Sequence, residues 1–341
     1  MATITGGSFD STNLTNFFNL TLPKIDMDVR DAIFKDNTYL KYMDQAGAID
    51  RNLTGDGNYI QFEMAENASV DARALSASID LNDPDINRVG TENFGEYSGA
   101  IPIDHVTLAK NSGKEKLIAY LEGRKKNLIK TMKKKLNNDL MNGSGAFPNL
   151  TGIASLISIT PTSGTIHGIA RSGNSWVQNQ QASATCSTTD GFGVICLKDI
   201  YALLKNASTG MGDQSMFKLA LMDKTVHTNM AYYLPDTANS QRVVINSNPG
   251  KNIPAEQLKY AGENTFYLGE ALAIWDNLAP SDSIRWINPD TLRIRILKDC
   301  DMITAMREAE NSFSKAILTG TSMQQVNLNP RYSAVLNAFT S

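Results

Sequence analysis

The segment from Lys114 to Gly143 constrains the fold more than any other, because it has helical periodicity over its whole length. Ser112 precedes it as a candidate N-cap, and Asn142-Gly143 is typical of a helix C-terminus. At 1.5 Å per residue such a helix is roughly 45 Å long, more than an ordinary globular core needs. We therefore predict a structural spine helix over residues 113–142. Its apolar stripe consists of Leu117, Ile118, Leu121, Leu128, Ile129, Met132, Leu136 and Leu140.

The opposite side of this predicted helix is rich in lysine. Between Lys110 and Lys135 the sequence has ten basic and two acidic residues, whereas residues 50–104 contain eleven acidic residues and three arginines. A solvated face is the usual interpretation of one charge run. Because the two blocks are adjacent and opposite in sign, we expect the acidic block to be attracted to a basic surface of a neighbouring copy, and part of the basic block to face a polyanion. The candidate lysines are Lys116, Lys126, Lys130, Lys133 and Lys134.

A long protruding hairpin is predicted ahead of the helix. Residues 59–64 alternate between apolar and polar side chains, and residues 100–109 are interpreted as the returning strand. The polar, acidic segment between them is too long for an ordinary connection in a compact domain, so it is expected to have a function of its own.

The remaining segments predict an α+β fold. Residues 1–24 have the composition of an extended arm that needs another surface to lie on. A short helix is predicted from Asp26 to about Tyr42, capped by Asp26 or Asp28. Further helices are predicted near 197–205 and 224–234, and strands at 217–222, 243–246, 265–268, 271–275, 283–287 and 292–297, followed by alternating apolar residues in the tail.

The composition predicts a folded chain, and the motifs expected of an enzyme are absent. The net charge of −3 does not by itself predict nucleic-acid binding, and the sequence has no signal peptide and no apolar run long enough to span a membrane. Its three cysteines are too scattered for disulfides or zinc, so no metal and no cofactor is expected. The motifs of hydrolases, zinc peptidases and nucleotide-binding loops are absent. The three histidines, His105, His167 and His227, have no acidic partner at a recognisable spacing, and the three tryptophans are interpreted as core residues.

Taken in order along the chain, these features resemble the major capsid proteins of tailed double-stranded DNA bacteriophages. The run Leu150-Thr-Gly-Ile-Ala154, followed by Ile166-His-Gly-Ile-Ala-Arg-Ser-Gly-Asn-Ser-Trp176, is similar to a passage that follows the spine helix in one branch of that family, although Ala170 stands where Asp is more usual. The segments Tyr267–Asp276, Ile284–Pro289 and Asn329–Leu336 are similar to its axial-domain and C-terminal strands.

The resemblance implies five parts: an N-terminal arm (1–46), an extended loop (47–110), a peripheral domain (111–190), an axial domain (191–310) and C-terminal strands that return to the peripheral domain (311–341). It implies that copies form pentamers and hexamers of an icosahedral virion capsid, assembled in the cytoplasm of a bacterial host. Packaged double-stranded DNA would be contacted through non-specific electrostatics. The sequence reaches its arm almost at once, so a separate scaffolding protein is expected, together with a portal. No membrane is involved.

Two alternatives remain open at this point. An encapsulin-type compartment has the same fold and encloses proteins, and the lysine-rich helix argues weakly against it. A cytosolic hydrolase or sugar-binding protein would use the loop Gly164–Trp176. Under the capsid interpretation this stretch connects the spine helix to the axial domain, and Trp176 is its packing anchor.

Overall fold

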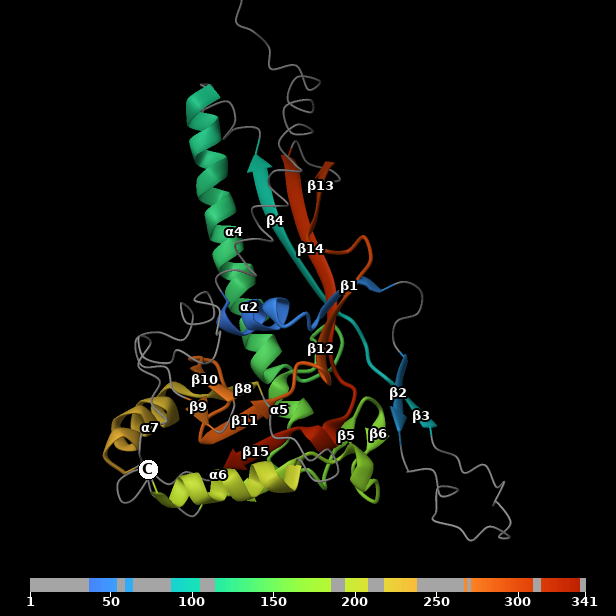
Figure 1. Ribbon diagram of the computed structural model, residues 1–341. Helices are drawn as coiled ribbons and strands as arrows, with labels where there is room; N and C mark the ends of the chain where they lie inside the picture. The colour runs from blue at the N-terminus through green and yellow to red at the C-terminus, as the bar shows by residue number, and fades with distance from the viewer. Residues whose placement is uncertain are drawn as a thin grey trace, which may run out of the picture.

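The protein is described by a computed structural model, and Figure 1 shows the arrangement of its elements. A long helix, α4 (Lys114–Asn142), runs beside one sheet, and a second sheet lies beyond the C-terminal end of that helix. A small hairpin projects from the opposite side of the molecule (Figure 1). The structure describes residues 37–53, 59–63, 87–104, 114–184, 194–207, 218–237, 267–268, 271–308 and 314–337.

The predicted spine helix is confirmed. Among the described side chains of its apolar stripe, Leu136 and Leu140 are almost inaccessible, Leu128 and Met132 are each 9% exposed, and Ile129 is half-buried. The helix packs on β4 (Gly95–Asp104). Gly99 of β4 makes the approach possible, because a Cβ atom there would lie 2.3 Å from the Leu128 Cδ1 atom.

A five-stranded sheet forms beside α4, organised around the long strand β14 (Ser314–Asn327). The first part of β14 lies between β13 and β4, both antiparallel to it, and its last part pairs with β12. The short helix α2 (Thr38–Gln45) lies against this sheet, where Gln325 donates a hydrogen bond to the Tyr39 hydroxyl at 2.7 Å. The other strands are β1 (Ile49–Leu53), β12 (Leu292–Leu297) and β13 (Ile303–Glu308).

A six-stranded mixed sheet forms the second layer, in the order β7-β15-β11-β8-β10-β9. Helix α6 (Val194–Ala207) packs against β7 and β15, and α7 (Lys224–Thr237) packs against β10. Trp286, which is inaccessible, lies in the core between sheet and helices. The strands are β7 (Gln180–Ser183), β8 (Leu219–Met222), β9 (Tyr267–Leu268), β10 (Ala271–Trp275), β11 (Ser283–Ile287) and β15 (Ala334–Asn337).

The connection from α4 to the second sheet contains only short elements. They are α5 (Ile153–Leu156), the hairpin of β5 (Thr165–Ile166) and β6 (Ile169–Ala170), and the 3-10 turn Ser175–Val177. A second 3-10 turn, Pro330–Tyr332, contacts the first one just before β15.

Three sequence predictions are wrong. The strand β2 (Tyr59–Glu63) pairs with β3 (Asn87–Thr91), whereas the expected partner, now β4, pairs with β14. Alternation identifies the two faces of a strand but not its neighbour, and β4 is drawn into the larger sheet by burial of its side chains against α4. Asn37 has extended backbone angles and caps α2, so a helix cannot run continuously from Asp26 to Tyr42. Trp275, the last residue of β10, is 41% exposed and is not a core residue.

Several expectations fall outside the described residues. They concern the N-terminal arm, the caps Asp26 and Asp28, the tip of the long hairpin, the strand at 243–246, His105, and the side chains of Lys116, Cys186 and Cys196. The third cysteine, Cys300, is a half-buried free thiol.

Candidate functional site

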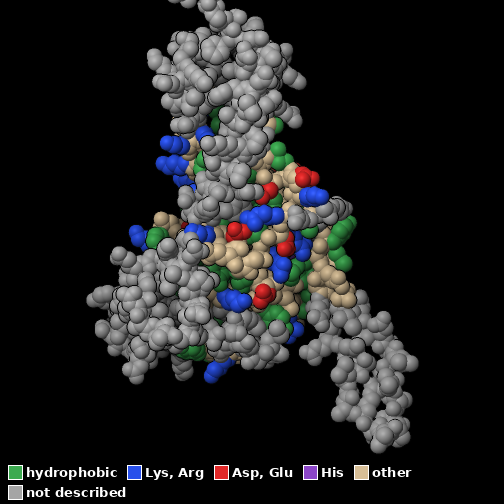
Figure 2. Space-filling view, turned by 45° about the horizontal axis from the view of Figure 1, so that its top comes forward, with side chains coloured by type: hydrophobic (Ala, Val, Ile, Leu, Met, Phe, Trp, Pro, Cys, Tyr) green, Lys and Arg blue, Asp and Glu red, His purple; other side chains and the backbone are tan. Residues whose placement is uncertain are grey.

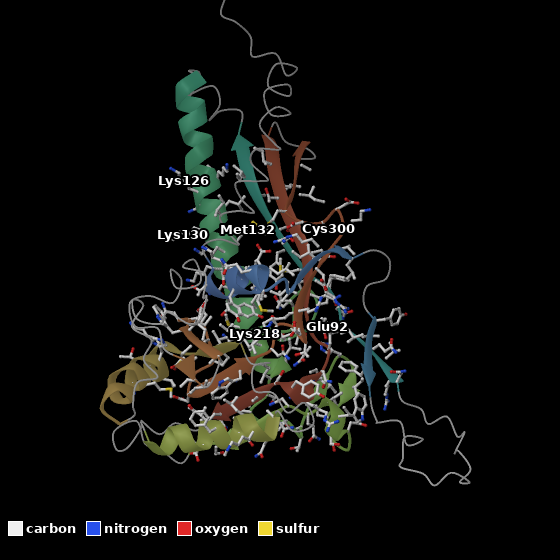
Figure 3. All side chains as sticks on the ribbon, viewed as in Figure 1. Glu92, Lys126, Lys130, Met132, Lys218 and Cys300 are labelled. Atoms are coloured by element: carbon white, nitrogen blue, oxygen red, sulfur yellow. The ribbon has the colours of Figure 1, made fainter. Side chains whose placement is uncertain are left out.

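The outer face of α4 carries a row of lysines. Lys126, Lys130 and Lys134 are exposed, and among the described residues none of the three has a hydrogen-bond or ion-pair partner. Figure 3 shows Lys126 and Lys130 directed away from β4, while Met132 points toward it. Residues four apart lie on one helix face about 6 Å from each other along the axis. The row therefore presents three positive charges in a line.

The other two candidate lysines differ from this row. Lys133 is half-buried and already takes part in an interaction within the chain. Only the backbone of Lys116 is described, within α4. Lys135, which the sequence did not single out, forms an ion pair with Asp139 at 2.9 Å and donates a hydrogen bond to Asn149 at 3.3 Å. The structure thus distinguishes the lysines that face solvent from Lys135, which connects α4 to the segment that follows it.

No acidic side chain interrupts the exposed face of α4 between Gly123 and Asn138. Figure 2 shows basic side chains gathered on the flank of the molecule where this helix lies. Lysine binds phosphate as a flexible point charge, so such a face suits non-specific contact with a polyanion and not recognition of a base sequence.

The base of the β2–β3 hairpin packs on the body of the same chain. Ile60 and Phe62 of β2 are buried, whereas Tyr59 and Val89 on the opposite face are 61% and 56% exposed. The Phe62 ring lies 5.9 Å from the Trp176 ring. Trp176 is half-buried and packs against the main core.

A buried polar network joins the same hairpin to two other parts of the chain. His167 Nδ1 lies 2.7 Å from Glu92 Oε2, and the backbone N–H of Asn327 donates to His167 Nε2 at 3.1 Å. Because Nε2 accepts, the imidazole donates from Nδ1 to the carboxylate. The Thr151 hydroxyl donates to the second oxygen of Glu92. The side chains of His167 and Glu92 are 0% and 8% exposed.

This geometry argues against the hydrolase alternative. Both ring nitrogens of His167 are occupied, and the side chain is inaccessible to solvent, so it cannot take a proton from Ser163 or Ser172. Ser163 instead bonds to Thr160 within its own turn. Ala170 stands at the position where the capsid proteins that this sequence resembles more usually have Asp. It is exposed, and its carbonyl accepts a hydrogen bond from Asn174.

The acidic partner of His167 was missed by the sequence reasoning. Glu92 is 75 residues away, and no local spacing signals the pair. The dipeptide His167-Gly168 between two isoleucines was the one available local signal, because it predicts a two-residue hairpin turn at His167. It does not identify the partner of His167.

A pocket of about 310 Å³ lies between α4 and β4. Its walls include Tyr97, Leu128, Met132 and Met302, and Thr321 contributes a hydroxyl that has no hydrogen-bond partner among the residues that the structure describes. No residue of Gly164–Trp176 lines this pocket. In the part of the chain that the structure describes, no cluster of metal-binding side chains occurs, and no helix has the length and apolarity to span a bilayer.

Comparison with known proteins identifies the fold. No family model and no curated protein matches the sequence. Among solved structures, the capsid of cyanophage A-1(L) aligns with a TM-score of 0.64 at 14% identity, covering 88% of this chain and 93% of the other. The capsid of a native GTA particle aligns with a TM-score of 0.56 at 10% identity, over 88% and 90% of the two chains. The capsid of cyanophage P-SCSP1u gives 0.51 at 12% identity, over 86% of each chain. The chain therefore has the fold of phage capsid subunits, as its sequence resemblance predicted.

Proposed function

We propose that this chain is the structural subunit of an icosahedral phage capsid, assembling through pentamers and hexamers into a closed shell around double-stranded DNA. The observation that carries this proposal is the match of nearly the whole chain, in order, to capsid subunits with TM-scores of up to 0.64. A match over an isolated domain would allow many functions, whereas this one covers 86–88% of the chain.

The two sheets suggest how the chain is divided into domains. We assign α4 and the five-stranded sheet to a peripheral domain, the six-stranded sheet with α6 and α7 to an axial domain, and the β2–β3 hairpin to an extended loop. These bounds differ from those that the resemblance implied, because β12 and β13, within 191–310, belong to the five-stranded sheet, and β15, within 311–341, belongs to the six-stranded sheet. The exposed side chains of Tyr59 and Val89 on that hairpin would be covered by a neighbouring subunit.

The DNA-facing role belongs to the row Lys126, Lys130 and Lys134. These lysines are exposed and lie on a face without acidic side chains, so they would attract phosphate without sequence preference. Contacts between these lysines and phosphate weaken as the salt concentration rises. Removing the three lysines should leave the fold unaffected, because no other part of the described chain depends on them. A separate scaffolding protein and a portal remain part of this proposal.

The test is assembly of the purified chain, alone and after co-expression with a candidate scaffolding protein, followed by electron microscopy. Capsomers or closed shells are expected in at least one of the two conditions. A chain that stays monomeric in both would contradict the proposal. Nuclease digestion of opened shells, with analysis of the released material, separates a genome container from a compartment that encloses protein.

A further inference from the structure

The turn between β5 and β6 has an unusual residue in a demanding conformation. His167 and Gly168 are its two central residues, with φ of 48° and 76°. Positive φ at both positions defines a type I′ turn, in which Asn-Gly is the preferred pair. Histidine is a less favourable choice at the first position, because its Cβ is crowded in the left-handed region. Such a conformation persists where the surrounding structure holds it in place.

The side chain of His167 is held on two sides. On one side it donates to Glu92, which lies in the link between β3 and β4. On the other side it accepts from the backbone of Asn327, the last residue of β14. Phe62 of β2 stacks on the ring, with 5.7 Å between centroids and an interplanar angle of 25°.

The backbone of the same turn also binds the hairpin. Thr91 of β3 donates its N–H to the His167 carbonyl at 2.8 Å. Gly90 lies so close that an added Cβ would be 2.8 Å from that carbonyl oxygen, which leaves no room for a side chain. Both strands of the hairpin therefore meet at one residue.

We propose that Glu92, His167 and Asn327 form a latch that fixes the base of the β2–β3 hairpin on the subunit body and so sets the direction in which the hairpin leaves it. Three segments far apart in the sequence converge on one imidazole. The facing groups are Glu92, Thr151, Phe62 and Asn327, and Glu92 is the only charged one among them. A subunit that reaches a neighbour through this hairpin needs its angle fixed before contact, because preorganisation removes the entropy of ordering it during assembly.

The variant His167→Asn tests the latch with the least disturbance. Asn favours the left-handed turn position, and its Nδ2 replaces the Nδ1 donor toward Glu92, but no atom replaces Nε2. The amide of Asn327 therefore loses its acceptor while the turn is kept. In unassembled subunits we expect this amide to exchange with solvent about tenfold faster, with residues 323–326 unchanged. The matched control is Ser172→Ala, an exposed position in the same segment, which should leave exchange unaltered.

Unchanged exchange at Asn327 in His167→Asn would overturn the latch. Should this variant fail to fold, Glu92→Gln serves as the second test, because it preserves shape and weakens the charge-assisted bond to His167; faster exchange at Asn327 supports the latch, and wild-type exchange overturns it. A separate arm rests on the proposed function: His167→Asn shells should be irregular or absent, whereas Ser172→Ala shells should be normal. Because exchange is measured on unassembled subunits, its result stands whether or not the chain builds a capsid.

Discussion

Tyr97 of β4 donates a hydrogen bond from its hydroxyl to Asp139 of α4 at 2.9 Å, and this bond crosses the interface between the spine helix and the sheet. The same hydroxyl accepts the backbone N–H of Leu150 at 3.2 Å. Burial, together with the bond to Asp139, raises the pKa of the Tyr97 hydroxyl, so it remains a donor at any ordinary pH. One side chain thus joins β4, α4 and the connection that follows the helix.

Removing that hydroxyl should weaken the joint. In Tyr97→Phe, Asp139 and the Leu150 amide each lose a partner in a buried place, and we expect a loss of about 2 kcal/mol in the free energy of unfolding. Urea denaturation of unassembled subunits measures this. Tyr59→Phe is the control, because the Tyr59 side chain is 61% exposed. Equal stability of the two variants would contradict the linking role of Tyr97.

Alanine substitution at two glycines in or next to α4 should change the free energy of unfolding in opposite directions. A Cβ at Gly143 would lie 2.2 Å from the Leu150 carbonyl oxygen and 2.4 Å from that of Asp139, so the backbone would have to move. We expect Gly143→Ala to lower the unfolding free energy by about 2 kcal/mol. Gly123 lies inside α4, and outside the helix's own backbone no atom of the described residues lies within 4 Å of its added Cβ, so Gly123→Ala should raise stability by about 1 kcal/mol. Thermal unfolding of both variants tests the opposite signs.

Trp176 and Trp275 form a second contrasting pair. Trp176→Ala removes the contact with Phe62 and part of the core, and we expect a loss of about 2 kcal/mol together with failed assembly. Trp275→Ala, at a residue that is 41% exposed, should change the stability of the unassembled subunit by less than about 1 kcal/mol. Chemical denaturation gives the energies and electron microscopy the assembly. Normal shells from the Trp176 variant would rule out its anchoring role.

His227 should make stability depend on pH. It is 5% exposed in α7, and burial lowers its pKa to about 4. Between about pH 6.5 and pH 4 the unfolded chain binds a proton that the folded chain does not, so this contribution to stability is complete above pH 6.5 and falls by up to about 3 kcal/mol as the pH drops to 4. Unfolding measured from pH 4 to 7.5 should show a shallower acid limb for His227→Gln. The same slope in both proteins would contradict a buried neutral imidazole.

The lysine row should govern the salt dependence of DNA binding. Each lysine that contacts a phosphate contributes roughly 0.9 to the magnitude of the slope of log affinity against log salt concentration. Replacing Lys126, Lys130 and Lys134 by glutamine in one triple variant should therefore reduce that magnitude by up to about 2.7. Binding of unassembled subunits to a linear duplex at several salt concentrations measures it. Lys135→Gln is the control, because its Nζ is held by Asp139. We expect this control to lower stability and to leave the slope largely unchanged; a triple variant with the wild-type slope would remove the DNA-facing role.

The spine helix shows how much a periodic pattern can predict. The helical spacing of its apolar residues, with Asn142-Gly143 at its end, identified both its extent and the side that is buried, because the position of an apolar stripe with a period of 3.6 residues is set within the segment itself. The lysines on its other face were equally visible. The Lys135–Asp139 pair has the i,i+4 spacing of a helix ion pair, whereas the hydrogen bond from Tyr97, 42 residues before Asp139, has no local signal.

The tertiary structure decided which segments become neighbours. Alternation predicted two strands at 59–64 and 100–109, but the hairpin closes on β3, while β4 joins β14 more than two hundred residues away. The Glu92–His167 pair and the exposure of Trp275 were hidden for the same reason. The sequence by itself determined local conformation and the polarity of each face, because those follow from the spacing of side chains within one segment. Partners, pairings and burial depend on free energies shared between distant segments, and these become defined only when the whole chain is packed.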